Sequence, residues 1–151
     1  MLHRHPLLSL VTLAYLGFVA WLTLTPDSAA PTSSDLVMRV LARLQRYDEL
    51  TWLTYDRAEF LANIALFVPV GLFLLLLVGT RFWWVAAALA FAMTSAIETA
   101  QRSIPGRVPD ERDLVANTLG ALAGIVVGVV LTLPAAIRRG RARRARASVL
   151  S

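Results

Sequence analysis

The stretch that decides the fold is "FLANIALFVPVGLFLLLLVG", residues 60–79, which carries no charged side chain. At about 1.5 Å of rise per residue, a helix of this length spans the roughly 30 Å hydrocarbon core of a bilayer. Similar apolar stretches occupy residues 7–25, 82–100 and 114–137, and Glu98 is the one acidic or basic side chain within the four. The sequence therefore predicts an integral membrane protein with four transmembrane helices.

The overall composition excludes several classes of function. The chain has 151 residues, of which 57% are hydrophobic, and its mean hydropathy is +0.62. Cysteine is absent, so neither a disulfide nor a thiolate metal site is possible. The two histidines, His3 and His5, lie at the N-terminus, which leaves no base for Ser-His-Asp chemistry in the rest of the chain. We expect no nucleic-acid binding, because the basic residues suit a membrane anchor better.

The arginines set the expected topology. Six arginines lie between residues 138 and 146, and positive charge favours the cytoplasmic side of a membrane. We therefore expect a membrane domain at residues 1–137 and an arginine-rich cytoplasmic tail at 138–151. Both termini would be cytoplasmic, with 26–59 and 101–113 outside. The first apolar run exceeds the roughly 7–15 residues of a signal-peptide core, so we expect that helix to be retained.

The first outer segment contains an amphipathic pattern. Between residues 34 and 47, apolar residues recur at helical spacing, while Arg39, Arg43 and Arg46 fall on the opposite face. We expect a helix in the membrane interface, whose arginine face is either solvated or binds lipid headgroups. The predicted fold is thus an all-α membrane protein. It is a four-transmembrane-helix bundle of two helical hairpins, with an amphipathic interfacial helix in the first outer loop.

Small residues recur every fourth position in the third and fourth apolar stretches. The two rows are Ala88, Ala92, Ala96 and Ala100, and Ala116, Gly120, Gly124 and Gly128. Small side chains allow the backbones of membrane helices to approach closely. We therefore expect these rows to form the contact between the third and fourth membrane helices.

Two short segments resemble each other. "DRAEFLAN" (56–63) and "DERDLVAN" (110–117) align without a gap, and each opens a membrane helix on the outer side. The resemblance suggests that two helical hairpins are related by a weak parallel repeat. In both segments an acid precedes the asparagine by four residues, which places the two side chains on one helical face.

Polar residues from several helices should meet at this outer end. Glu98 and Gln101 share the last turn of the third helix, at the depth where the second and fourth helices begin. Polar groups within a bilayer turn inward and find partners; for Glu98 we expect Arg107, Arg112 or Asn117. The candidate site residues are Asp56, Asn63, Glu98, Gln101, Arg107, Arg112, Asp113 and Asn117.

This set of side chains allows more than one chemistry. Arg107 and Arg112 could bind a phosphate, while Glu98 and Asp113 could act as general acid and base in an enzyme. Oxygen ligands would suit Mg²⁺ or Ca²⁺, although we assign no metal site or cofactor. The polar groups could also simply hold the helices together.

The same residues carry a resemblance to the VanZ-like family of small bacterial membrane proteins. It rests on "LTLTP" (22–26), "DRAEFLANIALFVPVGLFL" (56–74) and "IETAQRSIPGRVPDERDLVANTLGALAG" (97–124). The matching motif residues are Asp56, Asn63, Glu98, Gln101, Arg107, Asp113, Asn117 and Gly120. The resemblance implies a cell-envelope protein, since the namesake of the family is associated with low-level resistance to the glycopeptide teicoplanin.

We expect a protein whose partners are membrane lipids, and which binds an anionic or prenyl-phosphate lipid, or a lipid-linked glycan, at the outward-facing polar site. One alternative is a membrane-embedded hydrolase or transferase that acts on envelope lipids with Glu98 and Asp113. Another is an ion or proton pathway, which the apolar cytoplasmic halves of the four stretches disfavour. The sequence indicates neither the ligand nor the oligomeric state.

Overall fold

The computed structural model describes residues 6–25, 33–47, 50, 52–104 and 111–149, with side chains for all of these except 33–37 and 134–149. The elements are α1 (Pro6–Leu24), α2 (Ser33–Leu44), α3 (Tyr55–Val78), the short 3-10 helix η3 (Thr80–Phe82), α4 (Trp83–Gln101) and α5 (Glu111–Val149). Within the described chain, α1, α3, α5 and the η3–α4 segment are long and apolar enough to cross a membrane. The predicted all-α class with four membrane-spanning helices is confirmed.

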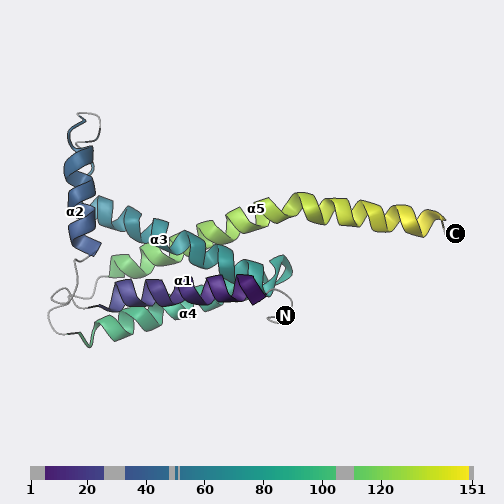
Figure 1. Ribbon diagram of the computed structural model, residues 1–151, viewed down its shortest axis with the longest axis horizontal. Coiled ribbons are helices and arrows are strands. Elements are labelled where there is room, and N and C mark those ends of the chain that lie inside the picture. The colour runs from purple at the N-terminus through teal and green to yellow at the C-terminus, as the bar shows by residue number, and fades with distance from the viewer. Residues whose placement is uncertain (1–5, 26–32, 48–49, 51, 105–110, 150–151) are drawn as a thin grey trace.

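The membrane-spanning helices lie side by side, and two parts of the chain depart from this bundle (Figure 1). Helix α2 lies crosswise at the end of the bundle where α3 begins. Helix α5 continues far past the opposite end. Its 39 residues correspond to about 58 Å of helix, nearly twice the thickness of a hydrocarbon core. The arginine-rich segment therefore continues α5 without a break.

Local chemistry explains where α3 begins and ends. Thr54 is extended, with φ −77° and ψ 166°, and Asp56 places a negative charge in the first turn, where the helix dipole favours it. At the other end Gly79 has φ 88°, a conformation that side chains other than glycine rarely adopt. Its N–H donates to the carbonyl of Leu75 at 2.7 Å. The chain then reverses through η3 into α4, which makes α3 and α4 an antiparallel hairpin.

The centre of the bundle is the contact between α3 and α5, where backbone meets backbone. A Cβ on Gly71 would overlap the carbonyl of Ala121, and a Cβ on Gly120 would overlap that of Ile64. Gly124 lies equally close to the backbone of Val68. Since these glycines carry no side chain, the two helices approach more closely than bulkier residues would allow.

This contact overturns the expectation for the small-residue rows. The row on α5 packs against α3, the second membrane helix, and not against the row expected on α4. Ala88, Ala92, Ala96 and Ala100 are exposed, whereas Ala86 and Ala90 are buried. The expectation was wrong because a row of small residues permits a close approach without specifying the partner. The polar residues of α4 share the face of Ala86 and Ala90, which turns that face inward.

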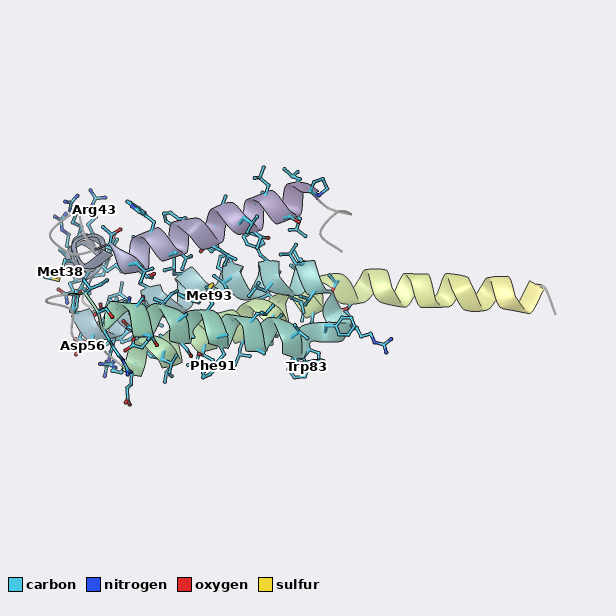
Figure 2. The ribbon with its side chains drawn as sticks, turned by 90° about the horizontal axis from the view of Figure 1, so that it is seen from below. Met38, Arg43, Asp56, Trp83, Phe91 and Met93 are labelled. Carbon is cyan, nitrogen blue, oxygen red and sulfur yellow. The ribbon has the colours of Figure 1, made fainter. Side chains whose placement is uncertain are left out.

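The surface of the bundle is apolar along its length and aromatic at its ends. Leu10, Phe91 and Val130 are more than half exposed, as suits side chains in contact with lipid. Trp83 and Trp84 are exposed beside Arg81 at one end, and exposed aromatic rings recur at the other end in Trp21, Tyr47 and Trp52. Figure 2 shows Trp83 and Asp56 at opposite ends of the bundle. Aromatic belts of this kind mark the two interfaces of a membrane.

Candidate functional site

Apart from Thr12, the buried polar residues of the described chain gather at or near one end of the bundle, which we call the polar end. It is formed by the last turns of α1 and α4 and the first turns of α3 and α5. Two hydrogen bonds join these segments in pairs, α3 with α5 and α4 with α1.

The first bond joins α3 to α5. Nδ2 of Asn63 donates to Oδ1 of Asp113 at 2.7 Å, across fifty positions of sequence. Asn63 lies two turns inside α3, while Asp113 lies in the first turn of α5. The two helices therefore run in the same direction here, and the acid of one repeated segment pairs with the asparagine of the other.

The second bond joins α4 to α1. Gln101 is buried at the last position of α4, and its Nε2 donates to the backbone carbonyl of Thr23 at 2.9 Å. This carbonyl belongs to the last turn of α1, where helical carbonyls have lost their partners along the chain. The amide of Gln101 thus caps α1 from a neighbouring helix.

Glu98 is the buried carboxylate of the polar end. It is only 6% exposed, and its Oε1 lies 3.5 Å from Nε of Arg102, one turn further along the chain. Arg102 is itself largely exposed, so this pair reaches from the bundle interior to the surface. Sequence analysis did not consider Arg102, although the spacing of four residues could have indicated it.

Three buried oxygen atoms at or near this end have no hydrogen-bond partner within the described part of the protein. They are Oγ1 of Thr94, Oε1 of Glu98 and Oδ1 of Asn117. Thr94 and Glu98 are four residues apart on α4, on the face that also carries Gln101, while Asn117 lies on α5. A buried polar atom without a partner costs about 1–3 kcal/mol, so three such atoms need a reason.

The hydroxyl of Thr94 lacks a hydrogen bond that other threonine hydroxyls of this protein make. Threonine hydroxyls in helices usually donate to the carbonyl four residues earlier. Thr12 does so at 2.8 Å and Thr118 at 2.7 Å. Thr94 is as deeply buried as Thr12 but makes no such bond. Sequence analysis missed Thr94; its position one turn before Glu98 was the signal that could have found it.

The remaining candidate residues have different surroundings. Asp56 is exposed in the first turn of α3. The guanidinium of Arg112 lies 5.9 Å from the centre of the Phe60 ring, a cation–π arrangement at the start of α5. Arg107 lies outside the described residues. The structure thus brings Asn63 and Asp113 together and buries Glu98, Gln101 and Asn117 at one end.

The arrangement favours binding of hydrogen-bond donors. A carboxylate oxygen and an amide oxygen accept hydrogen bonds, and a threonine hydroxyl can do so as well. Hydroxyl or amino groups of a ligand would complement all three unpartnered atoms. Among the described residues, no group of three or more His, Cys, Asp and Glu side chains is placed to hold a metal ion.

A comparison with protein families matches most of the chain, including the polar end. The sequence model of the VanZ/LLP1 family matches residues 12–132. The match contains α2, α3 and α4 whole, most of α1 and nearly all of the part of α5 that can span a membrane, and it ends before the arginine-rich segment. No curated protein and no solved structure matches the chain.

Proposed function

The chain belongs to the VanZ/LLP1 family, and from this premise we propose that it binds a lipid-linked glycan or anionic lipid at the polar end of its bundle. The observation that carries the proposal is the trio of buried oxygen acceptors on Thr94, Glu98 and Asn117, which make no hydrogen bond in the described protein, although the Glu98 oxygen lies in an ion pair with Arg102. Intramembrane ionisable groups are rare and usually serve a ligand or a pathway.

A glycan headgroup supplies what these atoms lack. Sugar hydroxyls donate hydrogen bonds, and each would remove part of the cost of an unpaired buried oxygen. The lipid tail would remain among the exposed apolar side chains that line the bundle, such as Phe91 on α4. Headgroup and tail would thus each lie in a matching environment.

Arginines at the polar end would receive the phosphate of such a lipid. The guanidinium of Arg102 is exposed and bound on one side to Glu98, and Arg112 lies near the start of α5. We include Arg107 because it belongs to the stretch of sequence that resembles the family. Guanidinium groups bind phosphate through paired N–H donors.

We further propose that the polar end faces outward from the bacterial plasma membrane and that both termini are cytoplasmic. The support is the run of arginines from Arg138 to Arg146, which follows the membrane-spanning part of α5. Arg81, in the turn at the same end of the bundle, adds to this positive side. A headgroup at the polar end would then belong to the outer leaflet.

The test measures which lipids the purified protein retains. Wild-type protein in detergent would be incubated with a prenyl phosphate carrying a sugar, the same prenyl phosphate without sugar, and the free prenol. Native mass spectrometry would count the bound lipid. We expect retention in the order sugar-phosphate, phosphate, prenol, with Asn117→Leu weakening the sugar form and Arg102→Gln weakening both phosphates.

Arg81→Gln is the matched control for charge, because Arg81 is equally exposed but lies at the opposite end. Equal retention of the three lipids by wild type, Asn117→Leu and Arg102→Gln would refute the proposal. Conversion of the lipid by wild type that is lost in both Glu98→Gln and Asp113→Asn would replace binding with the hydrolase or transferase alternative.

A link to teicoplanin is proposed on the same basis. Teicoplanin carries an acyl chain, so a protein that changes which lipids are displayed in the outer leaflet would weaken its action. Expression in a susceptible bacterium should raise the teicoplanin concentration needed to stop growth, and Asn117→Leu should lower it again. If cells with the protein and cells with the empty vector were equally susceptible to teicoplanin, the proposed link to teicoplanin would be excluded.

A further inference from the structure

An apolar cavity lies between the crosswise helix α2 and the start of α3, separate from the polar residues described above. Its volume is about 420 Å³, within the range of roughly 300–1,000 Å³ that small-ligand sites occupy. The lining is Val40, Leu41, Leu44, Leu53, Ala58, Leu61 and Ala62. None of these residues belongs to the polar site, so the inference goes beyond the proposed function.

The walls of this cavity are held in place. Leu41 of α2 and Leu53 of the connecting segment are both buried. Nε2 of Gln45 donates to the carbonyl of Leu53 at 3.2 Å, which ties the end of α2 to the opposite wall. Buried side chains and a hydrogen bond therefore define the position of α2 over the cavity.

Hydrocarbon fits this cavity better than water does. A bound water molecule needs two to four polar partners, and all seven lining side chains are apolar. An empty space of this size forfeits the dispersion contacts of its walls. In a membrane-spanning protein the nearest material that can fill it is the acyl chain of a lipid.

Two exposed arginines flank the cavity and suit the phosphate of such a lipid. Arg57 is four residues before Leu61 on α3, so it shares a helical face with a lining residue, whereas Arg43 lies beside the lining residue Leu44 at the edge of the apolar face of α2. Both are exposed. Figure 2 shows Arg43 at the polar end of the molecule, at the interface that the aromatic residues mark.

Two contacts with Trp52 hold Arg57 at the edge of the cavity. Its Nη1 donates to the carbonyl of Trp52 at 2.8 Å, and its guanidinium lies 5.9 Å from the centre of the Trp52 ring. The exposed Asp56 lies two residues from Ala58 and therefore on the opposite side of α3 from the cavity. Arg57 thus lies at one edge of the cavity lining and Glu59, three residues before Ala62, at the other, whereas Asp56 does not border the cavity.

From these observations we propose that the cavity binds one acyl chain of a membrane phospholipid, with the phosphate of that lipid at Arg57 and Arg43. The phospholipid would fix the crosswise helix α2 in the membrane interface. This lipid is distinct from the ligand of the polar end, and the two sites are independently testable.

The experiment compares a cavity-filling variant with a matched control. Full-length wild type, Ala62→Phe and Ala88→Phe would be purified in detergent and titrated with phosphatidylglycerol, and bound lipid counted by native mass spectrometry. Ala62 lines the cavity, while Ala88 is an exposed alanine of α4. Because phosphatidylglycerol is anionic and can also bind the polar end, the proteins are compared with one another: we expect wild type and Ala88→Phe to bind one more phospholipid than Ala62→Phe, whose occupancy of this cavity should fall about tenfold. Equal occupancy in all three would overturn the proposal.

Leu44→Trp fills the cavity from the side of α2 and gives an independent variant if Ala62→Phe does not fold. Arg57→Gln should weaken phosphatidylglycerol about fivefold and leave diacylglycerol, which has the same chains but no phosphate, unchanged. Equal loss of both lipids would refute the phosphate contact. A dimer that Ala62→Phe dissociates would show that a second copy fills the cavity and would overturn the acyl-chain assignment. Arg102→Gln should leave the difference in bound phosphatidylglycerol between wild type and Ala62→Phe unchanged, which separates this result from the test of the polar end.

Discussion

The hydrogen bond from Asn63 to Asp113, 2.7 Å long, joins the two repeated segments of the chain and sets α3 and α5 in parallel. Each segment begins a membrane-spanning helix at the polar end. The pair also explains how an acid and an asparagine can lie in the boundary of a bilayer, because the amide donor offsets part of the desolvation of the carboxylate. The arrangement of the polar end therefore depends on this contact.

Removal of this bond should destabilise the bundle measurably. We expect Asn63→Ala and Asp113→Ala each to lower the free energy of unfolding by about 1–2 kcal/mol in detergent. Because both changes remove the same bond, the double variant should lose about 1 kcal/mol less than the sum. Unfolding by a denaturing detergent, followed by circular dichroism, measures all four proteins. Strict additivity would contradict the role assigned to the pair.

Gly124 should be far less tolerant than Gly17, although both lie within membrane helices. A Cβ on Gly124 would overlap the backbone of Val68, whereas Gly17 has no neighbouring atom within 4 Å of that position. We expect Gly124→Ala to cost about 1–3 kcal/mol by separating α3 from α5. Gly17→Ala should be neutral or stabilising by up to about 1 kcal/mol, because alanine favours helix. Thermal unfolding compares the two, and equal effects would contradict the contact.

Thr94 and Thr12 provide a test of whether the polar end is built for a ligand. Both are 1% exposed, but only Thr12 has a partner for its hydroxyl. Thr94→Val should raise the stability of the lipid-free protein by about 1 kcal/mol, since it removes an unpaired polar group. Thr12→Val should not stabilise. A gain in stability together with weaker retention of the sugar-phosphate lipid would mark Thr94 as part of the site, and a loss of stability would argue against it.

Helix α1 should be the most easily released of the spanning helices. Side-chain hydrogen bonds hold it to the bundle: the hydroxyl of Tyr15 donates to the carbonyl of Leu66 at 2.8 Å, and Gln101 donates to that of Thr23. In Tyr15→Phe with Gln101→Leu, we expect faster amide exchange near the end of α1 and little change in α3. Hydrogen–deuterium exchange with mass spectrometry reads this out. Unchanged exchange in α1 would show that apolar packing alone holds it.

The absence of cysteine makes the topology directly measurable. Single cysteines can be introduced at Ser103, exposed at the polar end, and at Thr80, exposed in the turn at the other end. In intact cells a membrane-impermeant maleimide should label Ser103→Cys and reach Thr80→Cys only after permeabilisation. The reverse pattern would invert the proposed orientation and place the polar end in the cytoplasm.

Several features of the fold were readable from the sequence because they depend on local chemistry. Four long apolar runs require helices in lipid, since no other local structure satisfies their backbone groups there. The spacing of four between acid and asparagine placed Asp113 and Asn117 on one face of their helix. The glycine row on α5 correctly signalled a close approach of two backbones.

The partners in these contacts were not readable from the sequence. The glycine row packs on α3, and the alanine row on α4 is exposed, because the rotation of each helix depends on all its neighbours together. Arg102 and Thr94 were missed although each lies four residues from Glu98, since spacing alone does not show that Arg102 pairs with Glu98 or that the Thr94 hydroxyl has no hydrogen bond. The apolar cavity beneath α2 likewise needs the crosswise placement of that helix.

The sequence by itself determined that this protein is a four-helix membrane bundle with its polar residues at one end. Hydropathy and helical spacing act along the chain, so the order of residues is enough to state them. Only the tertiary structure decided which faces meet, which oxygen atoms remain unpaired and where a cavity forms. Those properties arise from close packing between segments that lie far apart in sequence, and a local pattern does not specify them.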